Sequence, residues 1–496
     1  MNTNYKFALI HIKAAYYEQL KFWPNNKYIV LYRAIKQCIL NIKLPHNWPL
    51  PPTRILAEEL KLSRTTVNKS YELLNLEKFI VSKQGSGNKV NYNSDKAQDD
   101  KKSVLDSIDR YPSISEKGES YTKNVQLLNR MPGANLAFRP GLPPIDAFPV
   151  NQWKKLLNTY WRHIKSSSLN YTLSSGITEL KKSIGQYLNV SRNIKCDYNQ
   201  IVIVSGSLQS LYLIANTLIN KGDSVVLENP LFPNVHSVFK SSQANLIPID
   251  LDDEGINIKK LKKIKEHPKL LHLTPSNHYP LGTKMSLKRR KEVLDWASER
   301  KVLIIENDYE NEIASVSERL PSIYSLDTED RTIYMGTFNR LLHPSIRLGY
   351  MIVPQYLKAT VKAILEHSHR FVSPSIQVVM NQFIEKNYLY QHINNSIEIA
   401  QERHQIFLNE FDKINSKLNI DNKQFSSLHV TALFPNGASV NDEKAMIKNL
   451  QERNITAFSL SKCYVNKPME KGLILGYSSV RSNILRQKVR KMKGII

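Results

Sequence analysis

Five short apolar runs, separated by longer segments, constrain the fold of this chain more than any other feature. They are 201–204 (IVIV), 224–229 (SVVLEN), 270–276 (LLHLTPS), 302–308 (VLIIEND) and 332–338 (TIYMGTF). Runs of this length that turn signals bound are typical of buried strands. Several of the segments between them have helical patterns, and such alternation is typical of a mostly parallel sheet. The pattern predicts an α/β body over 131–496, whose last part, from about residue 373, is rich in helix.

The chain before this body has a different pattern. Three helical stripes are followed by a hairpin at the Gly85–Gly87 turn; the stripes are Leu31, Ile35, Cys38 and Ile39, then Leu56, Ala57 and Leu60, then Val67, Tyr71 and Leu74. Thr53 and Ser63 can cap the second and third helices. We therefore predict an N-terminal extension at 1–26, a small helical domain with a hairpin at 27–92, and a polar linker at 93–130.

The third helix of this domain carries polar and cationic side chains away from its apolar stripe. They are Arg64, Thr65, Asn68 and Lys69, and such side chains at a helix N-terminus suit base edges in a major groove. The first amides of the helix and Ser63 can meet a phosphate, and Arg54 can hold the backbone. Lys83 and Lys89 flank the hairpin tip, which would sit by the minor groove. The domain therefore predicts double-stranded DNA as a partner; the alternative is a basic helical domain that binds protein.

Composition supports this interpretation without proving it. The chain has 69 Lys and Arg against 44 Asp and Glu, a formal charge of +25, and 27–90 alone has eleven basic and four acidic residues. Such an excess favours a polyanionic partner, although a lysine-rich proteome gives the same excess. Hydrophobic residues at 41% exclude wholesale disorder. Three scattered cysteines indicate neither a disulfide framework nor a metal site. Without a signal peptide or a long apolar run, we expect no membrane segment and a cytoplasmic location.

One stretch of about 40 residues resembles a known family. The sequence LPPTRILAEELKLSRTTVNKSYELLNLEKFIVSKQGSGNKV is similar to the winged helix-turn-helix of GntR-type bacterial regulators. The resemblance and the pattern together place these residues at the DNA: Arg54, Ser63, Arg64, Thr65, Thr66, Asn68, Lys69, Lys83, Gly85 and Gly87. Lys61-Leu62 and Lys78-Phe79 depart from the family, which often has a glycine in each of these loops. We expect altered loop geometry there rather than lost binding.

The body carries a second resemblance, over nearly all of 134–496. The motifs FRPGLPPIDAFPVNQW, NYTLSSGITELKKSIGQYL, LTPSNHYPLGTKMSLKRRKEVLDWA and YMGTFNRLLHPSIRLGYMIVP look like a fold type I aminotransferase. With the N-terminal domain, their order resembles the MocR (GabR/PdxR-like) subgroup of GntR regulators. The resemblance implies helices on both faces of the sheet, a smaller α+β subdomain at about 375–496, pyridoxal 5′-phosphate (PLP) binding and a head-to-tail homodimer. A twofold dimer would pair two DNA-binding domains with two half-sites.

The residues that PLP chemistry needs are replaced at two positions of the family motifs. Arg340 stands where the family has the Schiff-base lysine, and 310–357 holds no lysine. A guanidinium stays protonated and is no nucleophile for the aldehyde. Asn307 stands where the family has the carboxylate that holds the pyridine nitrogen, and Asp308 next to it should point to the opposite face of the strand. Phe232, Asn234 and Ile474 stand at positions that bind substrate in relatives.

The phosphate-binding positions match the family better. Gly206, Ser207 and Leu208 can present amides, Thr337 a hydroxyl and Arg347 a cation. By the same resemblance Tyr309 touches the ring hydroxyl, Tyr279 lies in the turn under the ring, and Tyr171 reaches the partner subunit's phosphate cup. Arg340 either clamps an anion or fills the vacated space and pairs with Asp308 or Glu310.

We therefore expect a transcriptional regulator with no catalytic residue. Its body would bind PLP non-covalently, bind another small anionic effector, or serve only as a dimerisation platform. The alternative is an active aminotransferase that uses a lysine from elsewhere. The operator, the effector and the direction of regulation stay open.

Overall fold

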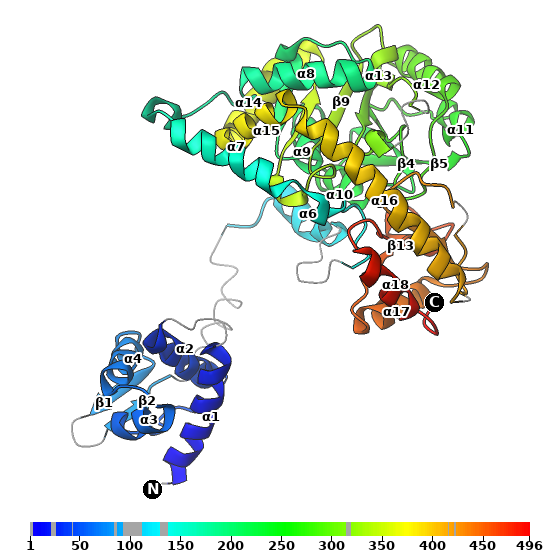
Figure 1. Cartoon of the computed structure of the whole chain (residues 1–496). Helices are drawn as coiled ribbons and strands as arrows, with labels where there is room; N and C mark the ends of the chain where they lie inside the picture. Colours follow the sequence, from blue (N-terminus) through cyan, green and yellow to red (C-terminus); the bar gives the residue numbers. More distant parts are fainter. Residues whose placement is uncertain are drawn as a thin grey trace. The chain divides into compact units, whose positions relative to one another are not determined.

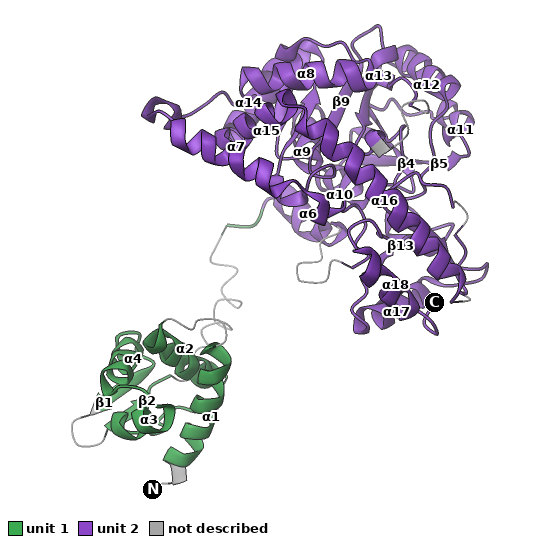
Figure 2. Ribbon diagram, viewed as in Figure 1, with its two compact units in different colours: residues 1–114 green, residues 115–496 purple. Residues whose placement is uncertain are grey.

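Two compact units make up this protein, residues 1–114 and 115–496 (Figure 2). The computed structural model describes residues 3–20, 26–41, 43–83, 87–92, 112–128, 137–313, 319–414, 416–420 and 423–496. Among these residues, no helix is both long enough and apolar enough to cross a membrane.

Unit 1 is a helical domain with a hairpin (Figure 1). Its elements are α1 (Thr3–Leu20), α2 (Lys27–Leu40), α3 (Thr53–Leu60), α4 (Arg64–Leu76), β1 (Ile80–Lys83) and β2 (Gly87–Val90). The predicted stripes of α2, α3 and α4 lie in one core. Ser63 caps α4, since its hydroxyl accepts a hydrogen bond of 3.1 Å from the Thr66 amide. The prediction for α3 was wrong, because Thr53 is its first helical residue and Pro52 precedes it without a side-chain cap.

The N-terminal extension contributes α1 to this core. Ala8, Leu9, Ile12 and Tyr16 are buried and pack with the apolar residues of α2 and α3. Gln19 donates a hydrogen bond of 3.0 Å to Gln37 of α2. Residues 3–20 are therefore an integral part of unit 1.

Both loops that depart from the GntR pattern keep a left-handed backbone. Lys61 ends α3 with φ 52° and ψ 46°, and Lys78 precedes β1 with φ 61°. Glycine adopts this conformation without the clash that a Cβ causes. At these two positions lysine adopts the conformation that glycine favours, at an energetic cost, and the expected change of loop geometry relative to the family stays a prediction.

Unit 2 is built on an eight-stranded sheet. Its order is β3 (Ile201–Val204), β10 (Gly349–Ile352), β9 (Thr332–Thr337), β8 (Leu303–Asn307), β7 (Leu270–Leu273), β4 (Ser224–Asn229), β5 (Asn245–Asp252) and β6 (Gly255–Ile256). β10 runs antiparallel to β3 and β9, and β6 runs antiparallel to β5, while the other pairs are parallel. The predicted mostly parallel sheet is confirmed, and each of the five apolar runs is a strand. β5, β6 and β10 were not predicted.

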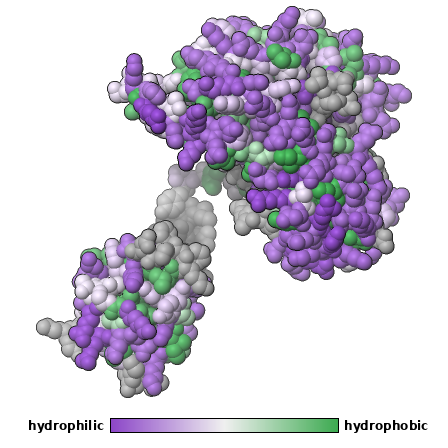
Figure 3. Space-filling view, in the orientation of Figure 1, coloured by the Kyte–Doolittle hydropathy of each residue, from purple (hydrophilic) through white to green (hydrophobic). Residues whose placement is uncertain are grey.

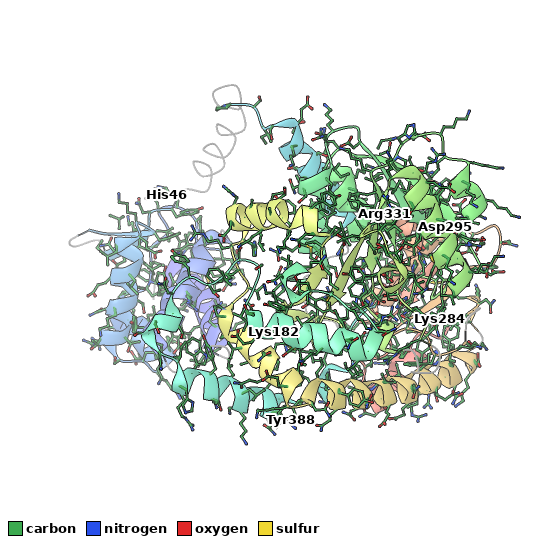
Figure 4. All side chains as sticks on the ribbon, turned by 90° about the horizontal axis from the view of Figure 1, so that it is seen from above. His46, Lys182, Lys284, Asp295, Arg331 and Tyr388 are labelled. Carbon is green, nitrogen blue, oxygen red and sulfur yellow. The ribbon has the colours of Figure 1, made fainter. Side chains whose placement is uncertain are left out.

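Helices cover both faces of this sheet (Figure 1). One face packs on α9 (Ser207–Leu218), α10 (Pro233–Ser241) and α14 (Lys358–Ser368). The other packs on α8 (Thr178–Arg192), α15 (Pro374–Glu385), α11 (Ile258–Lys262), α12 (Leu287–Arg300) and α13 (Ile323–Leu326). The helix α7 (Val150–His163) and the first turns of the long α16 (Tyr388–Asp412) also pack in this second core. Figure 4 labels Tyr388 where α16 begins.

The C-terminal part of unit 2 has its own small sheet and core. The sheet order is β11 (Val430–Leu433), β13 (Gly472–Leu475) and β12 (Phe458–Ser459), all antiparallel. The end of α16, α17 (Val440–Glu452) and α18 (Ser482–Arg490) surround it. An α+β subdomain therefore closes the chain.

The predicted linker, 93–130, includes a helix that packs on unit 2. α6 (Glu116–Asn124) lies against α10, where Ser237 donates a hydrogen bond of 3.0 Å to the Asn124 carbonyl. Lys221 and Glu116 form an exposed ion pair. The compact body therefore begins at about residue 115 rather than at 131.

Replacing Lys61 by Gly should stabilise α3 and α4, because glycine removes the strain of the left-handed position, worth about 1 kcal/mol. Hydrogen exchange of the amides of these two helices in the full chain measures the gain. Lys61→Ala is the matched control, since it removes the charge and keeps the Cβ. Equal protection in the two variants would contradict the assignment of strain.

Candidate functional site

The outer face of α4 in unit 1 is polar and exposed. Arg64, Thr65, Asn68 and Lys69 are exposed together on α4, as is Arg54 in the first turn of α3. The Lys69 ammonium lies 5.7 Å from the centre of the Tyr28 ring. These side chains form one basic and polar surface at the start of α4.

The other five predicted DNA contacts are Ser63, Thr66, Lys83, Gly85 and Gly87. Thr66 is half-buried, and its hydroxyl lies 2.8 Å from the Ser63 hydroxyl, so both side chains belong to the helix cap. Gly87 opens β2 with φ 75°, opposite Lys83 of β1. Gly85 and the side chain of Lys83 lie outside the described residues. The structure thus brings together the predicted residues of α3 and α4, and Gly87 marks the start of the second wing strand.

A partly buried ion pair occupies the predicted Schiff-base position of unit 2. Arg340 follows β9, and its guanidinium lies 2.6 Å from the carboxylate of Glu310. The same guanidinium lies 4.6 Å from the centre of the Tyr309 ring and 5.6 Å from that of Phe232. A Cβ on Gly141 would clash with it. Arg340 is therefore enclosed by a carboxylate, two aromatic rings and backbone.

Glu310 is held by groups from two distant parts of the chain. Its second carboxylate oxygen accepts hydrogen bonds of 2.9 Å from the Asn277 amide and from the Ser427 hydroxyl. Ser427 precedes β11, and its hydroxyl also lies 2.7 Å from Nδ1 of His429. Burial alone would lower the pKa of Arg340, but the Glu310 carboxylate raises it, and the net shift is upward. The guanidinium therefore stays charged, and the pair ties the large sheet to the C-terminal sheet.

The position that meets the pyridine nitrogen in relatives carries no charge. Asn307 ends β8, and its amide nitrogen lies 3.4 Å from Nε2 of His272, while its oxygen has no partner among the described residues. Burial lowers the pKa of His272 to about 3, so this neighbour is neutral. Asp308 pairs with Arg192 at 2.7 Å and accepts a hydrogen bond of 2.7 Å from Tyr334. Asp308 is therefore engaged elsewhere, and no carboxylate replaces the missing one.

Aromatic and aliphatic side chains close this end of the site. Phe232, Tyr279, Tyr309, Phe458 and Ile474 pack in one cluster, with the Phe232 and Tyr279 rings 5.0 Å apart. Ile474 is fully buried in it, although this position binds the substrate carboxylate in many relatives. The Tyr309 hydroxyl donates to the Asn277 carbonyl at 3.1 Å. The cluster offers no cation besides Arg340 that could bind a second carboxylate.

The opposite end of the site holds hydrogen-bond donors of the kinds that bind anions. Gly206 precedes α9 with φ 128°, and none of the described residues accepts from the Ser207 and Leu208 amides. Arg347 donates to the Ser205 hydroxyl at 3.2 Å and has no described carboxylate within 4.0 Å. Thr337 ends β9 at the same edge, and its hydroxyl accepts from the Asn339 amide at 3.2 Å. These groups are the donors that a phosphate needs.

Asn339 also enters this end. Its side-chain nitrogen donates to the Ser205 carbonyl at 3.3 Å, and its oxygen accepts from the Leu348 amide at 3.0 Å. A Cβ on Gly206 would clash with it. The sequence signal was available, because Asn339 stands where the family motif has a serine. Nothing local in the sequence marked Ser427 or His429, which lie far along the chain.

Tyr171 is not part of the site within one chain. Its side chain is 76% exposed, and its ring lies 4.9 Å from the Arg370 guanidinium and 6.3 Å from the Phe371 ring. A role at the partner's site is therefore still a prediction.

A groove of about 910 Å³ borders the Glu310 network. Ser427 and His429 line it together with Lys284, which Figure 4 labels. Both Asp253 and Glu470 lie along it.

The residues present do not fit covalently bound PLP. The position of the required amine holds Arg340, whose charge is neutralised by Glu310, and Asn307 cannot stabilise a protonated pyridine by charge. The phosphate end alone fits a phosphorylated or other anionic group. The described residues of the site therefore offer hydrogen-bond donors that suit an anion, while a guanidinium occupies the position of the Schiff-base lysine in relatives.

Comparisons with known proteins match both units. The model of the bacterial regulatory proteins of the gntR family matches residues 27–90, and the model of class I and II aminotransferases matches 142–474. The chain is 28% identical over 466 residues to the probable rhizopine catabolism regulatory protein MocR of Rhizobium meliloti, covering 93% of this chain and 92% of that protein. It is 30% identical over 470 residues to the uncharacterized HTH-type transcriptional regulator YdeL of Bacillus subtilis (strain 168), covering 94% and 96%.

Solved structures match unit 2. The crystal structure of the Pyrococcus horikoshii kynurenine aminotransferase has a TM-score of 0.68 and 23% identity, covering 79% of this chain and 98% of that one. This likeness shows the aminotransferase fold and extends no further.

Breaking the Arg340–Glu310 pair should destabilise unit 2. Arg340→Met leaves the Glu310 carboxylate buried without its cation, at a cost of about 3 kcal/mol, whereas adding Glu310→Gln should recover most of that loss. Urea unfolding of the two variants and the wild type measures both effects. Additive losses in the double variant would show that the two side chains do not act as a pair.

Proposed function

We propose a function for this chain, which belongs to the GntR-family transcriptional regulators of the MocR type. Unit 1 binds an operator, and unit 2 senses a small anion without covalent PLP chemistry. The observation that carries the proposal for unit 2 is the Arg340–Glu310 pair. It places a permanently charged guanidinium, paired with a carboxylate, at the position of the reactive amine in relatives. A bacterial regulator bound to chromosomal DNA works in the cytoplasm, the location that we propose.

The DNA-binding surface consists of the start of α4 and the first turn of α3. Arg64 and Asn68 carry the side chains best suited to base edges, while Arg54 and the capped α4 N-terminus suit phosphates. The wing residues Lys83, Gly85 and Gly87 are proposed to follow the backbone beside them. Two such surfaces in a homodimer would read two half-sites.

A homodimer through unit 2 is supported by exposed apolar side chains at the end of α7 and in the segment after it. Trp161 at the end of α7 and Leu169, Tyr171 and Leu173 after it are exposed in the single chain. Scattered apolar side chains are ordinary on surfaces, but four within thirteen residues favour an interface. Tyr171 would then reach the partner's anion site, as the head-to-tail arrangement of relatives implies.

The ligand class follows from the phosphate end of the site. Arg347, the Thr337 hydroxyl and the amides of Ser207 and Leu208 suit a phosphate or carboxylate group on a small molecule. PLP bound without a covalent bond belongs to this class. An active aminotransferase is the competing function; it requires a lysine amine, and none of the residues placed around Arg340 is a lysine.

Replacing Arg64 by Ala should weaken binding to the promoter region of the gene about tenfold, since one bidentate base contact is worth about 1–3 kcal/mol. Electrophoretic mobility shift at several salt concentrations measures the loss and the salt slope. Lys448→Ala on α17 is the control for loss of one charge. Two results together would contradict sequence recognition by α4: the Arg64→Ala and Lys448→Ala variants bind the promoter with equal affinity, and both bind unrelated DNA as tightly as the promoter.

Replacing Arg347 by Ala should abolish the rise in melting temperature that PLP or inorganic phosphate causes in the wild type, because the main cation of the anion site is lost. A thermal-shift titration measures the rise in melting temperature, with Lys448→Ala as the control.

In parallel, borohydride treatment with PLP and mass spectrometry should find no pyridoxyl group on a lysine of unit 2. A modified lysine there would overturn the non-covalent assignment.

A further inference from the structure

The helix α1 carries apolar side chains on two opposite faces. Ala8, Leu9, Ile12 and Tyr16 form its buried face. On the other side Phe7, Ile10, Ala14 and Tyr17 are exposed, Ile10 by 66%. We call these four residues the outer stripe. α1 also lies outside the segment that matches the gntR family, so the family does not account for it.

The spacing of the outer stripe is that of a coiled-coil seam. Its residues alternate steps of three and four, as positions a and d of a heptad do, with Phe7 and Ala14 at a and Ile10 and Tyr17 at d. At 1.5 Å per residue the stripe spans about 15 Å along the helix. A helix that is apolar all round is typically buried all round. Figure 3 shows hydrophobic residues exposed on unit 1 in the region that α1 occupies in Figure 1.

The charges beside the stripe identify the partner and its direction. Lys6 and Lys13 stand at the g positions, and His11 and Glu18 stand at the e positions. In a parallel pair each g residue faces the e residue five positions later in the other helix, so Lys13 meets Glu18 of a second copy and Lys6 meets its His11. An antiparallel pair would instead bring the two lysine flanks together. The charge pattern therefore matches a parallel second copy of α1.

Contacts within the chain bear on this pattern. The Phe7 ring lies 4.5 Å from the His11 ring and 5.4 Å from the Trp48 ring, so part of Phe7 already packs on unit 1. The Lys13 ammonium lies 3.2 Å from the carboxylate of Glu59 on α3. Both side chains are about half exposed, and such surface pairs hold their geometry weakly. Lys13 can therefore exchange between Glu59 and Glu18 of a second copy.

We propose that α1 is a dimerisation helix, which pairs in parallel with α1 of a second copy through the outer stripe and holds two DNA-binding domains together. This inference rests on the proposed homodimer of unit 2. A seam of two heptads is too short to hold two chains by itself, and tethering through the bodies supplies the effective concentration that it needs.

Disulfide trapping in the full chain tests the proposal. Identical a positions face each other in a parallel pair, so Ala14→Cys should form an intermolecular disulfide under mild oxidation. Leu76→Cys, at another exposed apolar position of unit 1, is the control. Cys196 is replaced by Ser throughout, because Cys38 and Cys463 are buried and Cys196 is partly exposed. Adding Ile10→Glu to Ala14→Cys should abolish the disulfide, whereas adding Leu76→Glu should leave it.

Sedimentation of the same samples separates the two proposals. A dimeric protein in which Ala14→Cys crosslinks no more than Leu76→Cys would overturn the role of α1 and leave the body dimer standing. A monomeric protein that forms no disulfide would overturn both. If the thiol at position 14 resists alkylation in the dimer and still does not crosslink, the outer stripe is covered by another surface and the proposal fails. Unchanged circular dichroism shows that each variant is folded.

Discussion

Burying a guanidinium is the constraint on which the site of unit 2 depends. Arg340 cannot lose its proton, so it needs a carboxylate wherever it is enclosed, and Glu310 supplies one at 2.6 Å. That carboxylate is itself enclosed and takes its remaining hydrogen bonds from Asn277, after β7, and Ser427, before β11. One replacement, of an amine by a guanidinium, is thus embedded in a network that joins the two sheets of the unit. A reversible reactive group has become a fixed structural one.

The two ends of the site differ in what they can still do. At the ring end, Arg340 lies against Tyr309 and Phe232, and Ile474 fills the apolar wall, so charge and volume are both satisfied within the protein. At the phosphate end, Arg347 has no described carboxylate partner, and the amides of Ser207 and Leu208 have no described acceptor. Recognition of an anion needs only such donors, whereas group transfer needs a nucleophile and an electron sink.

Unit 1 shows how local strain and local order combine around a recognition surface. The hydroxyls of Ser63 and Thr66 take part in the cap of α4. The capped helix carries the exposed side chains of Arg64, Thr65, Asn68 and Lys69. The turn before this helix keeps its left-handed residue although a lysine occupies it. The outer stripe of α1 is an exposed apolar surface of this unit that its own core does not explain.

The sequence by itself determined the two-part organisation, the strands at the five apolar runs, the cap at Ser63 and the permanent charge of Arg340, because periodicity, capping and residue chemistry are local properties. It could not determine β5, β6 and β10, whose patterns are less apolar or run antiparallel at a place that local signals do not mark, nor that 115–128 packs on the body. It left open whether Arg340 pairs with Asp308 or Glu310. Tertiary structure decided this, because Arg192 and Tyr334 approach Asp308 while Asn277 and Ser427 orient Glu310, and contacts between residues 26 to 117 positions apart leave no local pattern in the chain.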